Sequence, residues 1–285
     1  METPCAVLCL ALGGIKVECM EIIEKTFEYS RPDVFTLFPL GDAHFGQVQT
    51  AEKQLKQKIQ EISMTENAYW LGMGDLADCI LPHDKRWDLG LVADWVEKQN
   101  IAESVRQKIK GMFTPIADKC LGLLDGNHEY NFKLFSNYDL THNLCQDLKA
   151  PYAGYQCFLI LTFKRKGSNE SHVVKIHAWH GAGAATTEGA QLLRLKRLVK
   201  EFDASIFCMG HLHSIVHDIT DRLVVENHRV KQKPQIATIT GSWLRGYMLG
   251  ANASYIERYG YRPSHLGCPR IKIFPNTQQI TYESE

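Results

Sequence analysis

The sequence predicts one layered α/β domain, built from a mixed sheet or from two stacked sheets. Short apolar runs typical of buried strands recur along the chain, and amphipathic stretches with helical spacing lie between them. Most of the runs end in a cluster of Gly, Asp, His or Asn. The 285 residues are near the upper limit for one hydrophobic core, and 45% of them are hydrophobic and 22% charged. This composition excludes disordered and fibrous architectures.

Residues 1–33 are expected to form an N-terminal extension, and residues 34–285 the domain itself. The extension starts with a short apolar stretch at 5–14 and is expected to continue as a short helix over 17–29. No basic residue precedes the apolar stretch, so it does not fit a signal peptide. No stretch approaches the roughly 18 uncharged residues of a membrane span. We therefore expect a cytoplasmic protein without a membrane partner.

Six apolar runs predict buried strands, at 34–40, 68–73, 120–124, 173–179, 205–209 and 235–240. Two polar turns predict β-hairpins, one pairing 158–163 with 172–179 and one pairing 271–274 with 279–282. On the strand at 173–179, side chains alternate between faces, so His177 and His180 point in opposite directions. We therefore interpret His177 as a structural histidine, with support of a neighbouring metal ligand as the alternative.

Three stretches have apolar residues at steps of three and four, which predicts helices over 48–62, over 95–112 and from 188 to 202. The third helix follows Thr186 and Thr187, and Thr is a plausible N-cap for it. The segment 79–114 contains the second helix and could form a small helical cap over a site. Residues 243–285 are expected to be a C-terminal extension that completes the sheet.

The charge balance excludes a uniformly basic or acidic surface, because 32 Lys and Arg residues oppose 32 Asp and Glu residues. A local basic groove remains compatible with these totals. The nine cysteines include no C-x-x-C pair, which favours reduced, buried thiols in a cytosolic protein. The chain also has twelve histidines, so their placement matters more than the net charge.

Five polar clusters follow predicted strands, and together they indicate a metal centre. They are Gly-Asp-Ala-His at 41–44, Gly-Asp-Leu-Ala-Asp at 74–78, Gly-Asn-His-Glu at 126–129, His-Gly at 180–181 and Gly-His-Leu-His at 210–213. Mixed nitrogen and oxygen donors suit Mn, Fe, Zn or Co better than Ca or Mg alone. The clusters offer two Asp, one Asn and four His residues (44, 180, 211 and 213) as ligands, which is too many for one ion. Two cations that share one bridging carboxylate could bind all seven.

The pattern D-x-H, G-D-x-x-D, G-N-H-E, H and G-H-x-H resembles the calcineurin-like metallophosphoesterase superfamily. The resemblance runs from about residue 38 to residue 214, and the strand at 237–242 also fits. It implies a metallophosphoesterase-type α/β fold, with two sheets packed face to face, helices outside and a dinuclear metal site on strand-end loops. It also implies two divalent metal ions, with Mn²⁺ as the first choice and Fe, Zn, Co or Ni as alternatives.

The resemblance assigns a role to each motif residue. The first metal would be held by Asp42, His44 and His213, the second by Asn127, His180 and His211, and Asp75 would bridge them. His128 would contact phosphate and protonate the leaving oxygen, and Asp78 would orient His128. Glu129 is expected to brace its loop rather than to bind metal.

The function that follows is a dinuclear-metal-dependent hydrolase of phosphoester bonds, in which a metal-bridging hydroxide attacks phosphorus. We favour a phosphodiesterase acting on nucleotides or nucleic acid, with a nuclease as one form of it. The alternatives are a phosphomonoesterase, acting on small molecules or phosphoproteins, and an inactive metal-bound scaffold. Asp125 stands where protein phosphatases of this superfamily have Arg, which counts against that branch. The complete ligand set counts against a scaffold.

Arginine is interleaved with aromatic residues in the C-terminal extension, where Arg245 and Tyr247 are followed by Tyr259, Tyr261 and Arg262. Such side chains can stack on bases and pair with phosphates, so Arg245 and Tyr247 are candidate substrate-binding residues. The alternative is aromatic packing of the extension against the domain. The sequence leaves the oligomeric state open.

Overall fold

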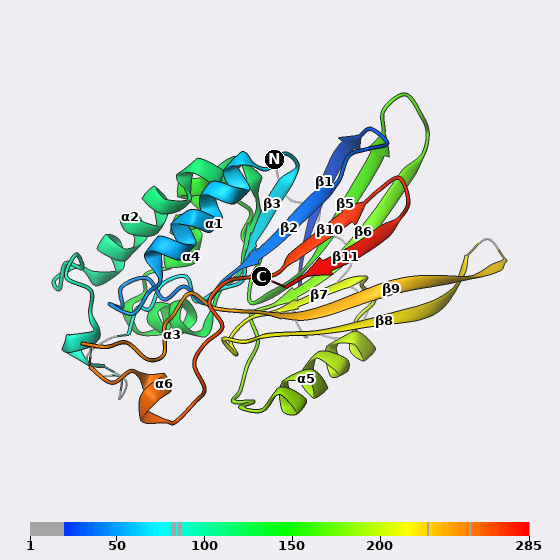
Figure 1. Cartoon of the computed structure of the whole chain (residues 1–285). Coiled ribbons are helices and arrows are strands. Elements are labelled where there is room, and N and C mark those ends of the chain that lie inside the picture. The colour runs from blue at the N-terminus through cyan, green and yellow to red at the C-terminus, as the bar shows by residue number, and fades with distance from the viewer. Residues whose placement is uncertain (1–19, 81–83, 85–86, 227, 251, 285) are drawn as a thin grey trace, which may run out of the picture.

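The computed structural model describes residues 20–284, apart from 81–83, 85–86, 227 and 251, and the described strands form two sheets packed face to face (Figure 1). The six-stranded sheet has the order β1 (Glu21–Tyr29), β5 (Gln156–Arg165), β6 (Ser171–Trp179), β7 (Ile206–Met209), β9 (Arg229–Thr240) and β8 (Ile215–Glu226). The five-stranded sheet has the order β11 (Gln279–Glu283), β10 (Arg270–Phe274), β2 (Phe35–Leu40), β3 (Ala68–Gly72) and β4 (Cys120–Leu123). This two-sheet α/β fold confirms the predicted fold class.

Both sheets are mixed. Strands β2, β3 and β4 run parallel to one another in one sheet, as do β6, β7 and β9 in the other. The pairs β5–β6, β8–β9 and β10–β11 are antiparallel hairpins. Because the carboxyl ends of parallel strands meet at one edge, the loops that follow these strands are gathered together, which is where α/β sheets bind ligands.

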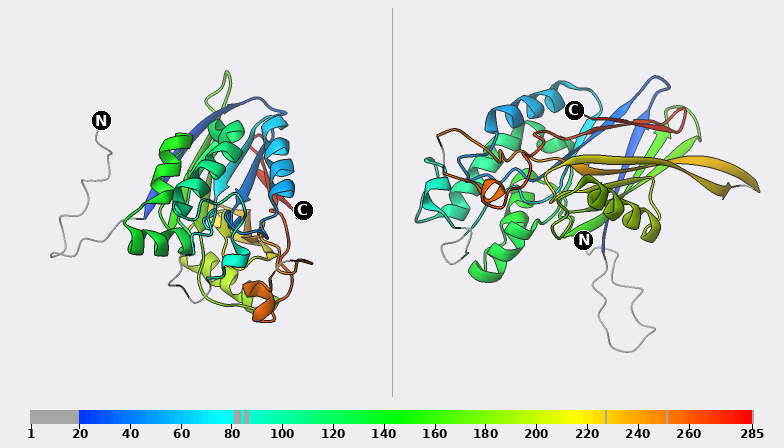
Figure 2. Two further views of the ribbon diagram at one scale, coloured as in Figure 1. Left: turned by 90° about the vertical axis from the view of Figure 1, so that its left-hand side faces the viewer. Right: turned by 60° about the horizontal axis from the view of Figure 1, so that its bottom comes forward.

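Helices cover the outer faces of the sandwich, as Figure 1 and the left view of Figure 2 show. α1 (Glu52–Met64), α2 (Ile101–Phe113) and α4 (Leu140–Leu148) lie over the five-stranded sheet, and α5 (Glu188–Glu201) lies over the six-stranded sheet. The remaining helical segments are α3 (Asn127–Ser136), α6 (Tyr255–Arg258) and the 3₁₀ turns η2 (Leu89–Leu91) and η3 (Thr114–Lys119).

Three apolar clusters separate the four layers. On β2, Leu37 faces the cluster between the sheets, whereas its neighbour Phe38 faces the cluster under the helices. Because both faces of β2 are buried, its sequence is a continuous apolar run rather than an alternating one. Under α5, Leu195 packs with Phe207 of β7.

The predicted strands and both predicted hairpins are confirmed, but the helix expected over 17–29 is wrong. Residues Glu21–Tyr29 form β1, which pairs in parallel with β5 along its whole length. Phe27 and Tyr29 are buried and Glu28 is exposed, which is the two-residue period of a strand. The apolar stretch at 5–14 and residues 17–19 lie outside the described residues.

Five other elements differ from the sequence-based expectation. α1 and α2 begin at Glu52 and Ile101, later than predicted, while Thr187 caps α5 as expected by accepting a hydrogen bond from the Ala190 N–H. The polar strand β8 was not predicted, because most of its residues are exposed. Helices α3 and α4 were also not predicted, and α3 begins inside the 126–129 cluster.

The β8–β9 hairpin extends beyond the rest of the sandwich in Figure 1 and in the right view of Figure 2. Leu223, Val225 and Val230 on this hairpin are more than two-thirds exposed, at 71%, 74% and 68%. No helix among the described residues is long and apolar enough to cross a membrane.

His177 of β6 packs in an apolar environment, as expected for a side chain on the strand face opposite to His180. Its ring stacks on Phe202 with the centroids 3.9 Å apart, and it contacts Phe158 in an edge-to-face arrangement. The side chain is fully buried, and neither ring nitrogen has a hydrogen-bond partner among the described residues. Burial without a partner lowers the pKa of His177 to about 4.

We expect His177 to make the fold sensitive to acid. Its pKa in the folded chain lies below the ordinary 6.5, so protonation favours the unfolded chain. The stabilising effect of the neutral ring is complete above about pH 6.5 and is lost as the pH falls toward 4, at a cost of about 3 kcal/mol. Urea unfolding at pH 7 and pH 4 should therefore show a smaller loss of stability in His177→Phe than in the wild type. His217→Phe, at an exposed position on β8, is the control, and equal pH sensitivity in wild type and His177→Phe would contradict this interpretation.

Candidate metal centre

Five loops from both sheets meet at one edge of the sandwich and carry all of the predicted metal ligands. Three loops follow strands of the five-stranded sheet and two follow strands of the six-stranded sheet. The residues are Asp42 and His44 after β2, Asp75 after β3, Asn127 after β4, His180 after β6, and His211 and His213 after β7. The fold thus brings together groups that are separated by up to 171 positions in the chain.

Two groups of these side chains are spaced as metal ligands. The ligating atoms of Asp42, His44 and His213 lie within 4.8 Å of one another. His213 Nε2 is 3.4 Å from Asp42 Oδ1 and 3.1 Å from His44 Nε2. This is the set predicted for the first metal.

The second group consists of Asp75, His180 and His211, whose ligating atoms also lie within 4.8 Å of one another. His180 Nε2 is 3.4 Å from Asp75 Oδ2 and 3.2 Å from Asn127 Oδ1, so the predicted amide ligand is adjacent. Asp75 Oδ2 is also 3.9 Å from His44 Nε2 of the first group. Asp75 therefore lies between the two groups, as a bridging carboxylate must.

Backbone carbonyls fix which nitrogen of two histidines is available. His180 Nδ1 is 2.7 Å from Met73 O, and His211 Nε2 is 3.1 Å from Gly183 O. Since a carbonyl only accepts, each of these nitrogens carries a proton and donates it, so the other ring nitrogen is the one that can bind a metal ion. Metal-binding histidines are held in this way by their outer nitrogen.

The backbone of the centre is strained where the ligands lie. Five of the seven predicted ligands have a left-handed φ, and these are Asp42 (50°), His44 (51°), Asp75 (47°), His211 (70°) and His213 (50°). Such a conformation is costly for residues other than glycine and persists at sites where function requires it. The Asp42 and His44 N–H groups donate to the carbonyls of Gly74 and Asp75, which holds the first loop against the second.

Gly126 permits the close approach of two of these loops. A Cβ atom at this position would lie 2.0 Å from Asp75 Oδ1. Glu129 then fastens the same loops, because its carboxylate accepts hydrogen bonds from the backbone N–H groups of Gly126, Asp75 and Ala77. The predicted bracing role of Glu129 is thus confirmed.

The buried charges favour a cation at this centre. Burial alone would raise the pKa of Asp75, but the nearby His180 and His128 outweigh it and hold the pKa well below its ordinary value. Burial alone would lower the pKa of His180, whereas Asp75 and Asp42 raise it to about 10. The two carboxylates therefore attract positive charge. Carboxylate, amide and imidazole donors in this arrangement fit divalent transition metals.

His128 and Asp78 form a pair beside the metal ligands. His128 Nδ1 is 2.6 Å from the Asp78 carbonyl, to which it donates, and 3.4 Å from Asp78 Oδ1. The Asp78 carboxylate is also 3.3 Å from His44 Nδ1, so it faces two histidines rather than one. Burial alone would raise the pKa of Asp78, but His128 and His44 hold it below its ordinary value.

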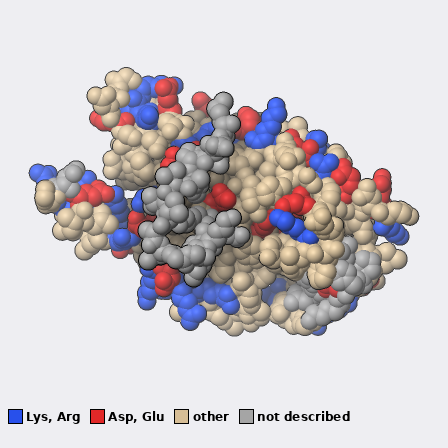
Figure 3. All heavy atoms as spheres, turned by 180° about the vertical axis from the view of Figure 1, so that it is seen from behind, with Lys and Arg blue, Asp and Glu red and all other residues tan. Residues whose placement is uncertain are grey.

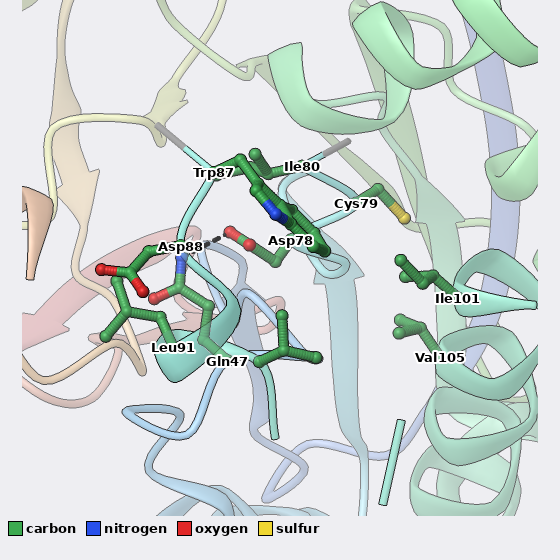
Figure 4. A pocket seen from close by; sticks show the side chains of 11 residues that line it. Gln47, Asp78, Cys79, Ile80, Trp87, Asp88, Leu91, Ile101 and Val105 are labelled. Atoms are coloured by element: carbon green, nitrogen blue, oxygen red, sulfur yellow. Dashed lines mark hydrogen bonds between the residues drawn. The ribbon is translucent and has the colours of Figure 1, made fainter. Parts of the chain in front are cut away.

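Gln47 adds a further contact to Asp78, which the sequence analysis missed. Its Nε2 donates to Asp78 Oδ1 over 2.7 Å, as Figure 4 shows. A small cavity of about 30 Å³, room for about one water, adjoins this pair, and apolar side chains including Ile101 and Val105 form part of its wall. Asp78 is therefore a buried carboxylate that is held by several polar partners.

Five of the seven predicted metal ligands line a larger cavity of about 210 Å³, namely His44, Asp75, Asn127, His211 and His213. His128 and Asn127 lie in its wall, together with two polar residues that the sequence analysis missed, Gln191 and Ser264. Gln191 could have been found from the sequence. It lies on the buried face of α5 one turn before Leu195, so a polar residue interrupts the apolar face of the helix.

The two candidate substrate-binding residues do not line this cavity. Arg245 donates to Gln54 Oε1 over 2.9 Å, and the Tyr247 hydroxyl donates to the Tyr261 carbonyl over 2.7 Å. Tyr261 and its neighbour Arg262, from the same arginine and aromatic segment, do line it.

The segment 79–114 contributes Ile80 to the cavity wall, whereas α2 packs into the helical layer. Its role as a cap stays a prediction, as do the boundaries of the two terminal extensions.

Comparisons with known proteins add little to this geometry. No protein family profile and no curated protein sequence matches the chain. Among solved structures, the chain is similar to a conserved uncharacterised protein, a predicted phosphoesterase, from Streptococcus pneumoniae TIGR4. The two are 12% identical, and the match covers 89% of this chain and 99% of the other with a TM-score of 0.34. The structure itself shows a two-sheet α/β fold with buried clusters of Asp and His.

Proposed function

We propose that this protein is a phosphodiesterase that acts on nucleotides or nucleic acid and depends on two divalent metal ions, Mn²⁺ in the first place. The observation that carries the proposal is the pair of ligand groups with Asp75 between them. One carboxylate shared by two nitrogen-rich sets is the arrangement that a dinuclear centre requires.

Two bound cations would neutralise charge on the phosphoryl oxygens and lower the pKa of a water nucleophile. The chain's own contribution begins with His128, which lines the cavity and whose Nδ1 proton is engaged by the Asp78 carbonyl. Its Nε2 is therefore the atom that donates a proton to the leaving oxygen. Asp78 acts as a positioning residue, because its carboxylate fixes the rings of both His128 and His44.

The alternative is a phosphomonoesterase. Such an enzyme would need only the two ligand groups and His128, and no contact with an organic group on the far side of the phosphate. The cavity favours a diester, since its wall continues past the ligands to residues of α5 and of the C-terminal extension, which could contact an organic group. The scaffold alternative is disfavoured because the ligand groups and the His128–Asp78 pair are both complete.

The charges of the surface give limited support to a polymeric substrate. On the face seen in Figure 3, basic and acidic side chains are intermingled rather than gathered in one basic stripe. Positive charge for phosphate would then come mainly from the metal centre. The six cysteines that the structure describes are all free, which supports our proposal of a reducing, cytoplasmic location.

A substrate panel tests the proposed activity. After removal of metals by a chelator, the chain should be inactive, and Mn²⁺ should restore hydrolysis of bis-p-nitrophenyl phosphate. We expect turnover of this diester to exceed that of p-nitrophenyl phosphate, with single-stranded DNA as the polymeric comparison. A preference for the monoester would establish the phosphomonoesterase instead. No turnover with Mn²⁺, Fe²⁺, Zn²⁺, Co²⁺ or Ni²⁺ would favour the scaffold.

A further inference from the structure

Two residues of the cavity wall each have a buried side-chain oxygen that lacks a hydrogen-bond partner among the described residues. The two oxygens are Gln191 Oε1 and Ser264 Oγ. Gln191 is only 2% exposed, so bulk water does not satisfy it from outside the cavity. Buried polar atoms are nearly always hydrogen-bonded in native proteins. Two such atoms in the residues of one cavity wall therefore point to a bound group that supplies their partners.

The amide of Gln191 is held in one orientation. Its Nε2 donates to the Ala185 carbonyl over 2.9 Å and to Ser214 Oγ over 3.1 Å. Because the carbonyl only accepts, the nitrogen must be on that side, and Oε1 is the atom left without a partner. Ser214 follows His213 directly, so this contact ties Gln191 to the metal-binding loop. Gln191 Oε1 thus offers a fixed acceptor, which selects a ligand with an N–H or O–H donor.

Another part of the wall consists of residues 261–264 from the C-terminal extension, together with Ile256 of α6. Arg262 Nη2 lies 3.4 Å from the Thr186 carbonyl and so links this wall to the loop before α5. Tyr261 and Arg262 have planar side chains of the kind on which bases stack. The Ser264 hydroxyl can donate or accept, which complements the acceptor of Gln191.

The size of the cavity restricts what it can hold. At about 210 Å³ it is smaller than the roughly 300–1,000 Å³ of most ligand pockets, so it has room for one compact group beside the phosphoryl group. A planar heterocycle with N–H donors on its edge suits the planar side chains of Tyr261 and Arg262, the fixed acceptor and the hydroxyl together. An aliphatic group would leave both polar atoms unpaired.

We infer that this cavity is a nucleobase subsite, in which Gln191 Oε1 accepts a hydrogen bond from the base and Ser264 Oγ makes a second one. The substrate is then a nucleoside phosphoester, with its base beside the metal centre. This inference rests on the proposed function and narrows it from phosphodiesters in general to those that carry a base at this position.

Equilibrium binding tests the subsite without requiring turnover. The full chain loaded with Mn²⁺ is titrated calorimetrically with adenosine, guanosine, cytidine and uridine 5′-monophosphates, and with ribose 5-phosphate as the ligand without a base. At least one nucleotide should bind tenfold or more tightly than ribose 5-phosphate. Equal affinity for all five ligands overturns the inference. The hydrolysis of bis-p-nitrophenyl phosphate is measured separately, so failure of the proposed function and failure of the subsite give different results.

Two variants assign the recognition to the named atoms. Gln191→Leu and Ser264→Ala should each reduce the preference for the tightest nucleotide over ribose 5-phosphate by about tenfold, since each leaves a group of the base unpaired. Gln235→Leu is the matched control, because Gln235 is also a buried glutamine but lies on β9, where its Nε2 donates to the Ala204 carbonyl. Should Gln191→Leu fail to fold, Ser264→Ala decides the question. A wild-type preference in the folded variants overturns the assignment.

Discussion

Replacing Asp75 by Asn should reduce kcat for bis-p-nitrophenyl phosphate by about a thousandfold or more while the protein stays folded. Asn preserves the shape of the side chain, and its amide oxygen can still accept the hydrogen bond from the His128 N–H to Oδ1. What is lost is the negative charge that lies between the two ligand groups, with Oδ2 3.4 Å from His180 Nε2 and 3.9 Å from His44 Nε2. Metal content, measured by mass spectrometry after gel filtration, should fall below two ions per chain.

The matched control for Asp75→Asn is Asp125→Asn. Asp125 is another buried aspartate and precedes the 126–129 cluster, but its carboxylate accepts a hydrogen bond from the Tyr152 hydroxyl and belongs to neither ligand group. This variant should keep two metal ions and most of the activity. Wild-type turnover by Asp75→Asn would refute the bridging role, and so the dinuclear centre as we describe it.

Replacing His128 by Asn should leave both ligand groups intact and lower kcat by about a hundredfold to ten thousandfold. The loss should depend on the leaving group, because a proton donor matters most when the leaving oxygen is strongly basic. Esters of nitrophenol should therefore lose less activity than esters of alkyl alcohols. Rates for a series of aryl and alkyl methyl phosphates, with the metal content of each sample, measure this dependence.

The control for His128→Asn is His142→Asn. His142 is exposed, stacks on Tyr152 with the ring centroids 3.9 Å apart and belongs to neither ligand group. It should keep wild-type rates with every ester. If His128→Asn loses metal, the third cluster of His44, Asp78 and His128, whose ligating atoms also lie within 4.8 Å of one another, binds a cation itself. The same loss of rate with all leaving groups would exclude His128 as the proton donor.

Most of the fold could be predicted from the sequence, because in most elements the apolar residues of the pattern are also the residues that are buried in the structure. The run at 34–40 is apolar on both faces because Leu37 and Phe38 of β2 face different cores, and α5 has both its cap and its apolar stripe in the sequence. β1 could not be predicted, because only Phe27 and Tyr29 are fully buried and its strand state depends on pairing with the distant β5. β8 is likewise held by β9 rather than by its own residues.

The same contrast holds at the candidate site. The Asp, His and Asn residues after each strand were identified from the sequence, because metal chemistry restricts which side chains can serve and the motifs keep them together in short segments. The contact of Asp78 with His44, the carbonyls that fix His180 and His211, and the unpaired atoms of Gln191 and Ser264 were not. Each of them depends on the distance between segments that no local pattern encodes.

The sequence by itself therefore determined the class of fold, the set of candidate metal ligands and the chemistry that those donors can support. Strand periodicity and donor type are local properties, and local properties can be read along one chain. Only the tertiary structure decided which walls face the metal centre. Arg245 and Tyr247 turned out to contact Gln54 and the backbone of Tyr261, whereas Tyr261 and Arg262 line the cavity. The physical reason is that the direction of a side chain in an irregular segment follows from long-range packing, since such a segment has no repeating backbone geometry.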